Sequence, residues 1–225
     1  MVQDHLPHPH STVTAYEGVL LVDHPAVTDR VSRLRDVTTP SNVFRQLVSE
    51  VSAFVAYEAL RDLSMTDIEI DTPVERGVRF PRIDETVLLV PVLRAGLGMV
   101  QSIQELVPLT RVAHVGLRRD EITHQSNVYL NRLPSDLQGR RVVVCDPMLA
   151  TGGSLAQVCT LVADHGATDI TALCLIASVP GLQFFHSVHP SVRVACAAVD
   201  LELNEQAYIV PGLGDAGDRL FGPPD

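Results

Sequence analysis

Residues 141–155 read RVVVCDPMLATGGSL, and this stretch decides the fold because it joins a strand, an acid and a glycine-rich turn. The β-branched run ends at Cys145, and Asp146 follows it directly. Gly152 and Gly153 let backbone N–H groups converge on one point, and the helix that begins beside them adds the positive end of its dipole. On the strand side, the Asp146 carboxylate can accept hydrogen bonds from sugar hydroxyls. The stretch therefore predicts a site for a phosphorylated sugar.

Similar apolar runs recur along the chain, separated by segments of helical length. The runs that indicate strands are residues 86–92, 111–117, 141–145, 169–177 and 192–199. The helices predicted between them are residues 98–106 and 153–165. This alternation predicts an α/β fold with a mainly parallel central sheet flanked by helices. Ligands of such a sheet bind beyond the carboxyl ends of its strands.

Two further segments flank this pattern. A long helix is expected to begin at an N-cap, Ser41, because apolar residues then recur at helical spacing. This stripe, which predicts core packing, consists of Phe44, Leu47, Val48, Val51, Phe54 and Val55. Residues 118–134 are polar and weakly patterned, which favours a mobile loop or β-hairpin over the site.

Length and composition predict one globular domain. The chain has 225 residues, of which 46% are hydrophobic, enough for a single sizeable core. We expect a flexible tail over residues 1–18 and one domain over residues 19–225. The tail holds His5, His8 and His10. No metal site is expected there, because a flexible segment has no preformed ligand geometry.

The charge balance and the cysteines narrow the classes of function. The formal net charge of -10 opposes binding to nucleic acid or to an anionic membrane surface. Four cysteines stand in apolar runs without a CxxC pair, as expected for buried, reduced thiols: Cys145, Cys159, Cys174 and Cys196. Apolar runs such as residues 172–179 are too short to span a bilayer, and residues 1–18 lack the apolar core of a secretory signal. A cytoplasmic protein is expected.

Three motifs resemble the uracil phosphoribosyltransferases, within the type I phosphoribosyltransferases. Residues 146–154 (DPMLATGGS) resemble their binding signature for 5-phosphoribosyl-1-diphosphate (PRPP), and residues 91–99 (PVLRAGLGM) resemble their diphosphate-side loop. Residues 208–222 (YIVPGLGDAGDRLFG) resemble their uracil-binding segment, which is long and unusual. The resemblance covers about residues 22–222. It implies the type I fold and the conversion of uracil and PRPP to uridine monophosphate (UMP) and diphosphate.

The resemblance also assigns roles to residues. It implies catalytic roles for Arg94, Arg119 and Asp215. PRPP binding falls on Arg94, Arg119, Asp146, Pro147, Met148, Leu149, Ala150, Thr151, Gly152, Gly153, Ser154 and Asp215, and uracil binding on Ile209, Gly214, Asp215 and Ala216. An arginine fork suits phosphate oxygens, and backbone groups of a glycine-rich loop suit the edges of a neutral base. Magnesium is expected to arrive as the PRPP complex, without direct protein ligands.

The chain departs from the family pattern mainly in residues 117–134. Arg118 stands in place of a tyrosine, where it competes with Arg119 for the role of the loop cation, and Ile122 stands in place of a glutamate. Glu202 replaces a glycine elsewhere. Three alternatives therefore stay open: a transferase for another pyrimidine base, a PRPP-binding regulator, and a catalytically impaired paralogue. A homodimer or larger homo-oligomer and activation by GTP are further expectations from the resemblance.

Overall fold

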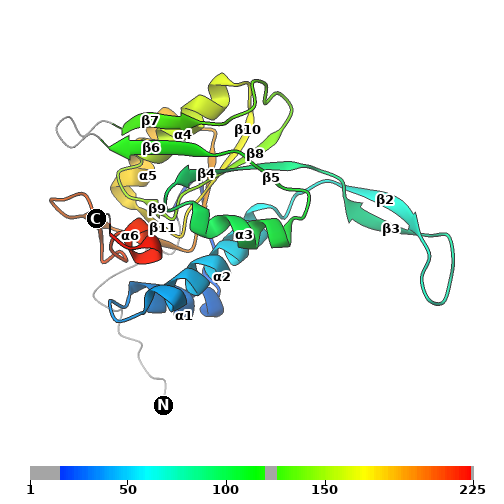
Figure 1. The fold of residues 1–225 in the computed structure, drawn as a ribbon, viewed down its shortest axis with the longest axis horizontal. Coiled ribbons are helices and arrows are strands. Elements are labelled where there is room, and N and C mark those ends of the chain that lie inside the picture. The colour runs from blue at the N-terminus through cyan, green and yellow to red at the C-terminus, as the bar shows by residue number, and fades with distance from the viewer. Residues whose placement is uncertain (1–15, 120–125, 224–225) are drawn as a thin grey trace, which may run out of the picture.

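A computed structural model describes residues 16–119 and 126–223, which build a central sheet with helices on both faces (Figure 1). The strands of this sheet are β1 (Val19–Leu21), β4 (Val87–Leu93), β5 (Arg111–Val112), β6 (Val115–Arg119), β7 (Ser126–Asn131), β8 (Arg141–Cys145), β10 (Asp169–Leu173) and β12 (Arg193–Cys196). Their order is β1-β12-β10-β8-β4-β6-β7, and β5 pairs with β4. The pairings are parallel, apart from that of β6 with β7. The predicted mainly parallel α/β sheet is confirmed.

The helices cover the two faces of the sheet separately. They are α1 (Pro25–Arg35), α2 (Ser41–Ala59), α3 (Leu97–Leu106), α4 (Gly153–Asp164), α5 (Val179–Val188) and α6 (Ala216–Phe221). Strand β8 shows the division, because alternate side chains of a strand point to opposite faces. Val143 and Cys145 join the hydrophobic cluster with α1, α2, α3 and α6, whereas Val142 and Val144 join the one with α4 and α5.

The long helix α2 begins at Ser41 and buries most of the predicted stripe. Phe54 is an exception: its ring is exposed, and the Arg30 guanidinium carbon lies 5.5 Å from the ring centre. The prediction of Ser41 as N-cap is wrong. Pro40 occupies that position in an extended conformation, without a side-chain cap, because the fixed φ of proline suits the residue before the first turn.

Three predicted strands are each divided in two. The chain leaves the central sheet after β10 and β12 and enters a small parallel sheet of β9 (Met148–Leu149), β11 (Ile176–Ser178) and β13 (Ala198–Asp200). At the break after β10, the N–H groups of Leu175 and Ile176 both donate to the Pro147 carbonyl, at 2.9 and 3.1 Å. Successive N–H groups on one carbonyl re-aim the chain, as a β-bulge does. The run 111–117 is likewise divided into β5 and β6.

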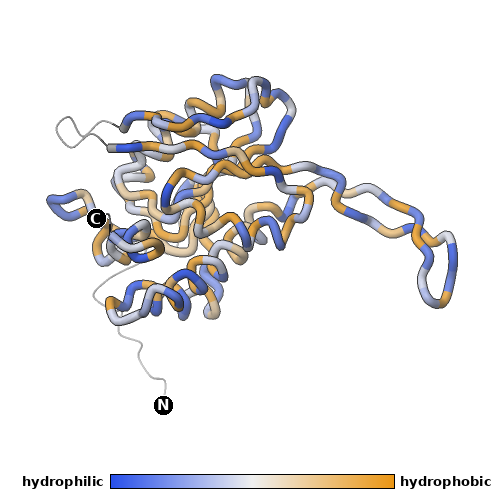
Figure 2. Tube along the Cα trace, viewed as in Figure 1, coloured by the Kyte–Doolittle hydropathy of each residue, from blue (hydrophilic) through white to orange (hydrophobic). Residues whose placement is uncertain are grey.

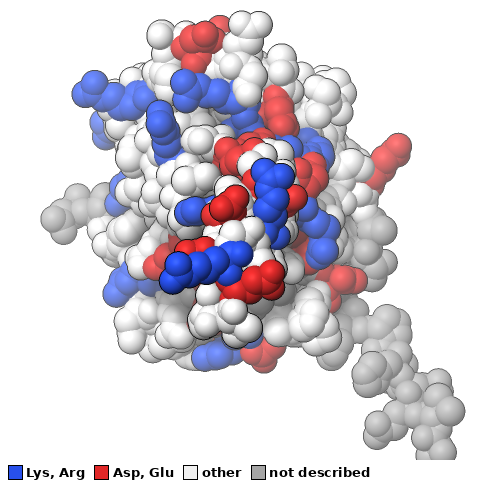
Figure 3. All heavy atoms as spheres, turned by 90° about the vertical axis from the view of Figure 1, so that its right-hand side faces the viewer, with Lys and Arg blue, Asp and Glu red and all other residues white. Residues whose placement is uncertain are grey.

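A hairpin that the sequence patterns did not predict projects from the body. It consists of β2 (Met65–Ile70) and β3 (Val78–Ile83), which pair antiparallel. Hydrophilic and hydrophobic residues are mixed along it (Figure 2), and its side chains are exposed or half-buried. Seen from the side toward which the hairpin points, Arg side chains alternate with Asp and Glu (Figure 3). Without one buried face, the segment lacks the alternation that marks a strand.

Two further sequence expectations fall partly outside the described residues. Most of the predicted tail, residues 1–15, lies outside them, whereas Tyr16 packs half-buried against the cluster of α4 and α5. The predicted loop or hairpin over residues 118–134 contains the antiparallel pair β6–β7, and residues 120–125 lie outside the described part. Within residues 16–119 and 126–223, helices with the length and apolarity needed to cross a bilayer are absent.

Candidate functional site

A cavity of about 300 Å³ lies beyond the carboxyl ends of β4 and β8. Its wall contains Ala95, Asp146, Met148, Ala150, Gln206, Ala207, Tyr208, Ile209, Gly214, Asp215, Ala216 and Gly217. Three separate stretches of the chain thus meet here: the turn after β4, the stretch after β8, and a segment close to the C-terminus. This is the edge at which parallel sheets bind their ligands.

The first wall is the glycine loop, residues 146–154, between β8 and α4. Asp146 continues β8, and its N–H donates to the Leu173 carbonyl at 3.1 Å. Burial raises the pKa of the Asp146 carboxyl to about 7; a hydrogen bond from the Met148 N–H opposes this shift, and the Asp215 carboxylate adds to it. The carboxyl therefore changes charge close to neutral pH.

The end of the glycine loop packs tightly against the start of α5. Gly152, the N-cap of α4, has a φ of +79°, and a Cβ there would lie 2.5 Å from the Gly181 carbonyl oxygen. Only glycine meets both conditions. Ser178 fixes the junction: its hydroxyl donates to the Ala150 carbonyl at 2.6 Å and accepts the Gly181 N–H at 2.9 Å. Ser178 was not predicted as a site residue, although a serine two residues before Pro180 is an N-cap signal.

The turn after β4 contains Arg94 and Ala95, and Ala95 lines the cavity. The Arg94 side chain is half-exposed, and its Nη2 lies 3.3 Å from Oδ1 of Asp218 on α6. The turn is anchored beneath the site, because the Gly96 N–H donates to the Val92 carbonyl at 2.9 Å and the Cys145 thiol lies 3.9 Å from the Gly96 carbonyl. Arg94 is therefore a weakly paired cation beside the cavity: it is not one of the lining residues, but its Nη2 would lie 3.9 Å from a Cβ on Gly217, which is.

The second wall is the C-terminal loop, residues 209–217. It begins in β15 (Ile209–Val210), which pairs antiparallel with β14 (Glu202–Leu203). Within it, Asp215 is the N-cap of α6, and its Oδ1 accepts the Asp218 N–H at 2.9 Å. Gly214, Ala216 and Gly217 line the cavity here, and their side chains are at most a methyl group. The wall is therefore mostly main chain.

The structure brings many, though not all, of the predicted residues to one cavity. Those on its wall are Asp146, Met148, Ala150, Ile209, Gly214, Asp215 and Ala216. Pro147 and Leu149 are buried, and the Pro147 carbonyl already accepts two N–H groups. Thr151, Gly152, Gly153 and Ser154 lead into α4 without lining the cavity. Arg119 is the last residue of β6, and its side chain lies outside the described residues; Arg118 is exposed.

Residues 206–208 also line the cavity, although none of them was assigned a role; Tyr208 begins the motif over residues 208–222, and Gln206 and Ala207 precede it. They belong to a turn in which the Asn204 carboxamide oxygen accepts the N–H groups of Gln206 and Tyr208, at 3.0 and 2.9 Å. Ala207 adopts a φ of +64° within it. The asparagine four residues before Tyr208 was the available signal, since asparagine side chains commonly close such turns.

Acidic groups at the site are few. Asp146 and Asp215 are the two carboxylates on the cavity wall. In the part of the chain that the structure describes, clusters of three or more His, Cys, Asp or Glu that could hold a metal ion are absent.

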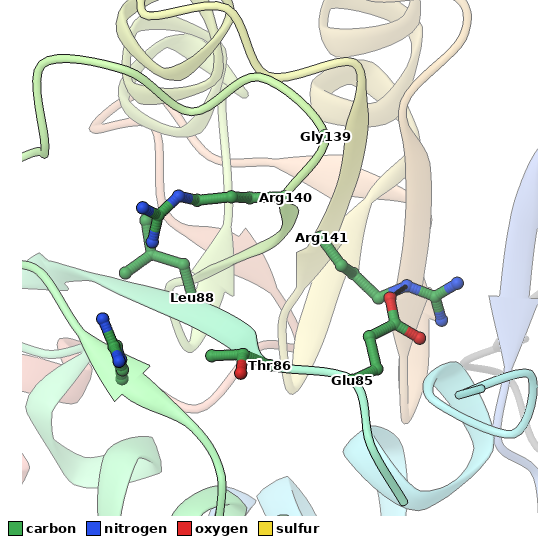
Figure 4. A pocket seen from close by; sticks show the side chains of 7 residues that line it. Glu85, Thr86, Leu88, Gly139, Arg140 and Arg141 are labelled. Carbon is green, nitrogen blue, oxygen red and sulfur yellow. Dashed lines mark ion pairs between the residues drawn. The ribbon is translucent and has the colours of Figure 1, made fainter. Parts of the chain in front are cut away.

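A separate cavity of about 310 Å³ lies at the other end of the same strands (Figure 4). Arg140 and Arg141 point apart there, and Arg141 lies beside Glu85 (Figure 4). Nε of Arg141 is 3.0 Å from both Glu85 and Asp169, and Nη1 is 2.7 Å from Asp62. Because β8 runs from Arg141 to Cys145, this ionic cluster and Asp146 occupy opposite ends of one strand.

Comparisons with known proteins agree with this geometry. The family model described as uracil phosphoribosyltransferase matches residues 21–223. A uracil phosphoribosyltransferase from Clostridium perfringens is 49% identical over 201 residues, which cover 89% of this chain and 96% of that protein. One from Staphylococcus aureus is 46% identical over 204 residues, which cover 91% and 98%.

Solved structures support the fold. A protein from Aquifex aeolicus superposes with a TM-score of 0.85 at 34% identity, covering 91% of this chain and 98% of that one. An adenine phosphoribosyltransferase from Trypanosoma brucei, at 14% identity, has a TM-score of 0.57 and covers 92% of both chains, which shows a shared fold. With the matched family model and these relatives, the chain belongs to the uracil phosphoribosyltransferase family.

Proposed function

We propose that this chain transfers the 5-phosphoribosyl group of PRPP to uracil, releasing diphosphate and forming UMP. The single observation that carries the proposal is the cavity between the glycine loop and the C-terminal loop, with Asp146 on one wall and Asp215 on the other. A phosphorylated sugar suits the first wall, and a small planar base suits the second. Family membership adds the reaction class.

The PRPP half of the proposal rests on the glycine loop. Residues 146–154 hold the 5-phosphate through backbone N–H groups at the start of α4, which also presents its positive dipole end. Asp146, when ionised, accepts hydrogen bonds from the ribose hydroxyls. Arg94 contacts the diphosphate with a fork of donors, and Arg119 at the end of β6 is the second cation in the proposal.

The uracil half rests on the C-terminal loop. Main-chain groups of Ile209, Gly214 and Ala216 read the edges of the base, which carries carbonyl acceptors and N–H donors without charge. Asp215 orients the attacking ring nitrogen. The bond between C1′ and the diphosphate oxygen breaks, and its electron pair leaves with the diphosphate. The ring nitrogen forms the new bond to C1′, and its proton passes to the departing diphosphate. Alignment of base and sugar, together with cations at the leaving group, lowers the barrier.

Magnesium, bound as the PRPP complex, would supply positive charge to the departing diphosphate. The two cavity carboxylates fit a hard cation that keeps most of its water, since oxygen ligands are what Mg²⁺ prefers. Asp215 and Asp146 would face the hydrated ion, and the rest of its shell would come from PRPP.

The setting of the enzyme is also part of the proposal. We favour one phosphoribosyltransferase domain over residues 19–225, acting in the cytoplasm as a homodimer or larger homo-oligomer, with GTP as an effector to be tested. All four cysteines are free and buried, which suits a reducing compartment.

The test is UMP formation from uracil, PRPP and magnesium, with cytosine, orotate, hypoxanthine and no base as parallel reactions. Uracil-specific turnover is the expected outcome. Turnover with another base alone would replace the substrate assignment. PRPP binding without turnover on any base would contradict the proposal and favour a PRPP-binding regulator or an impaired paralogue.

A further inference from the structure

The C-terminal loop is held by an ion pair that lies outside the cavity wall. Arg35, the last residue of α1, and Asp200, the last residue of β13, face each other fork to fork. Nη1 and Nη2 of Arg35 each lie 2.7 Å from a different carboxylate oxygen of Asp200. The Asp200 side chain is 1% exposed and that of Arg35 is 19% exposed. Paired forks of this kind fix direction as well as distance.

Both members of the pair also bind the backbone of one residue, Gly212. Nη1 of Arg35 donates to the Gly212 carbonyl at 2.8 Å, and the Gly212 N–H donates to Asp200 at 3.0 Å. Gly212 has a φ of +58°, and a Cβ there would lie 2.1 Å from the Ile209 carbonyl oxygen. The pair therefore holds both polar backbone groups of the residue at the tight fold of the loop.

A second arginine ties the next residue to the same helix end. Nη1 of Arg219 donates to the Leu213 carbonyl at 2.9 Å, and it also donates to the carbonyl of Leu34 on α1. Nη2 donates to the Asp36 carbonyl at 2.7 Å, and the guanidinium carbon lies 4.1 Å from the ring centre of Phe44. The end of α1 is thus the support on which residues 212 and 213 are fixed.

The C-terminal loop borders two cavities. A second cavity of about 550 Å³ lies behind it, and Gly214 and Asp215 line this cavity as well as the one at the site. Arg35 and Arg219 lie on the wall of the rear cavity. Ile209, Leu213 and Ala216 pack into the hydrophobic cluster on either side of Gly212, and the polar anchors fix the backbone of Gly212 between them.

From this geometry we infer that Arg35 and Asp200 are positioning residues for recognition of the base. They act through Gly212, which lies between Ile209 and Gly214, and so keep the main-chain groups of the C-terminal loop in register. The inference rests on the proposed role of that loop in binding uracil. Main-chain recognition is sensitive to such a shift, since a displacement of about 1 Å can cost about a hundredfold in rate.

The experiment compares Arg35→Lys and Asp200→Asn with the parent enzyme in steady-state kinetics. Lysine keeps the charge and loses the fork, and asparagine keeps the shape and loses the charge. We expect KM for uracil to rise about tenfold to a hundredfold, with KM for PRPP within about twofold of the parent. Arg30→Lys is the matched control, because Arg30 is on the same helix and pairs with Glu50 on α2 at 2.5 Å, far from the loop.

The outcomes separate this inference from the proposed function. If the parent enzyme forms no UMP, the proposed function is wrong. If the parent is active, and the folded Arg35→Lys and Asp200→Asn variants keep its KM for uracil, the inference is wrong. An equal rise in both KM values, or the same rise in Arg30→Lys, would also overturn it, because both indicate a general loss of structure.

If the variants do not fold, a measurement on the parent chain tests the inference. Hydrogen–deuterium exchange of the Gly212 amide should be slow before uracil is added, because Asp200 already accepts its hydrogen bond. Fast exchange that slows only on adding uracil with PRPP would show that the loop is not held in advance, and the inference would be wrong.

Discussion

The hydroxyl of Ser178 lies 2.6 Å from the carbonyl oxygen of Ala150, so the N-cap residue of α5 holds the glycine loop in place. The same hydroxyl accepts the Gly181 N–H. One side chain thus satisfies two backbone groups from different segments, and it links the rigidity of the loop to a helix that does not reach the cavity.

We predict that Ser178→Ala lowers the free energy of unfolding by about 1–3 kcal/mol, because it leaves the half-buried Ala150 carbonyl and the buried Gly181 N–H without this partner. KM for PRPP should rise as the loop loosens, while KM for uracil changes less. Urea denaturation and steady-state kinetics measure the two effects. Ser187→Ala is the control: Ser187 is exposed on the same helix and donates to the Phe184 carbonyl at 2.6 Å, so its loss should cost less than about 0.5 kcal/mol.

The N-cap role of Asp215 can be separated by substitution from its proposed role in catalysis. Asn is as good an N-cap as Asp, so Asp215→Asn should keep α6 and leave the free energy of unfolding within about 0.5 kcal/mol of the parent. Turnover should nevertheless fall by about a hundredfold or more, because the charge that faces the substrates is lost. Asp136→Asn is the matched control, because Asp136 accepts the Gln138 N–H in a turn outside the site. Full activity of Asp215→Asn would remove Asp215 from the catalytic set.

The raised pKa of Asp146, about 7, predicts a pH dependence of stability with a definite sign. Between the ordinary aspartate pKa, near 4, and 7, the folded chain holds a proton that the unfolded chain has lost. The contribution of this group to stability is therefore greatest below pH 4 and falls as the pH rises to 7. Asp146→Asn should stabilise the chain relative to the parent at pH 8, and the difference should vanish near pH 4. Denaturation curves at both pH values measure it, and a difference independent of pH would contradict the assignment.

Ligand binding should show the opposite trend. Ribose hydroxyls are donors, so they prefer the ionised Asp146, and the affinity for PRPP should increase as the pH rises through about 7. Titration calorimetry across pH 6–8 measures it. PRPP also titrates, and for this reason the Asp146→Asn profile is subtracted: only the part absent from the variant belongs to Asp146.

Arg141 should matter for stability and not for turnover. Its side chain is 11% exposed and reaches three carboxylates, so Arg141→Met should lower the free energy of unfolding by about 2–4 kcal/mol, with kcat unchanged. The neighbouring Arg140 forms no ion pair that involves residues 16–119 or 126–223, and Arg140→Met should cost much less. Thermal denaturation at low and high salt, beside an activity assay, distinguishes the two variants.

Local patterns predicted the parts of the fold whose apolar run or stripe has clear ends. Strand β8 was predicted with both ends correct, and α4 within one residue, because a β-branched run stops at an acid and glycines precede a helical stripe. The breaks after β10 and β12 escaped prediction because apolar residues continue through them. Periodicity does not register a change of sheet when both sides of the break are buried.

The candidate site was predictable where the backbone itself demands particular residues. Gly152 and Asp146 carry their signals locally, and the cavity places Asp146 opposite Asp215. Ser178 and Asp200 were missed for a common reason: each acts on the backbone of a segment distant in sequence, so its importance depends on tertiary contacts. Arg35 was missed as well, since a helix-terminal arginine is more often a surface charge.

The opposite ends of β8 offer an opportunity for protein engineering. One end of this five-residue strand holds the ionic cluster of Arg141, and the other leads directly into the glycine loop. A library that replaces the cluster with apolar residues of similar volume could raise heat tolerance while substrate preference stays constant. Selection for altered bases would then draw on residues 206–217 alone, so the two properties could be evolved in separate rounds and combined.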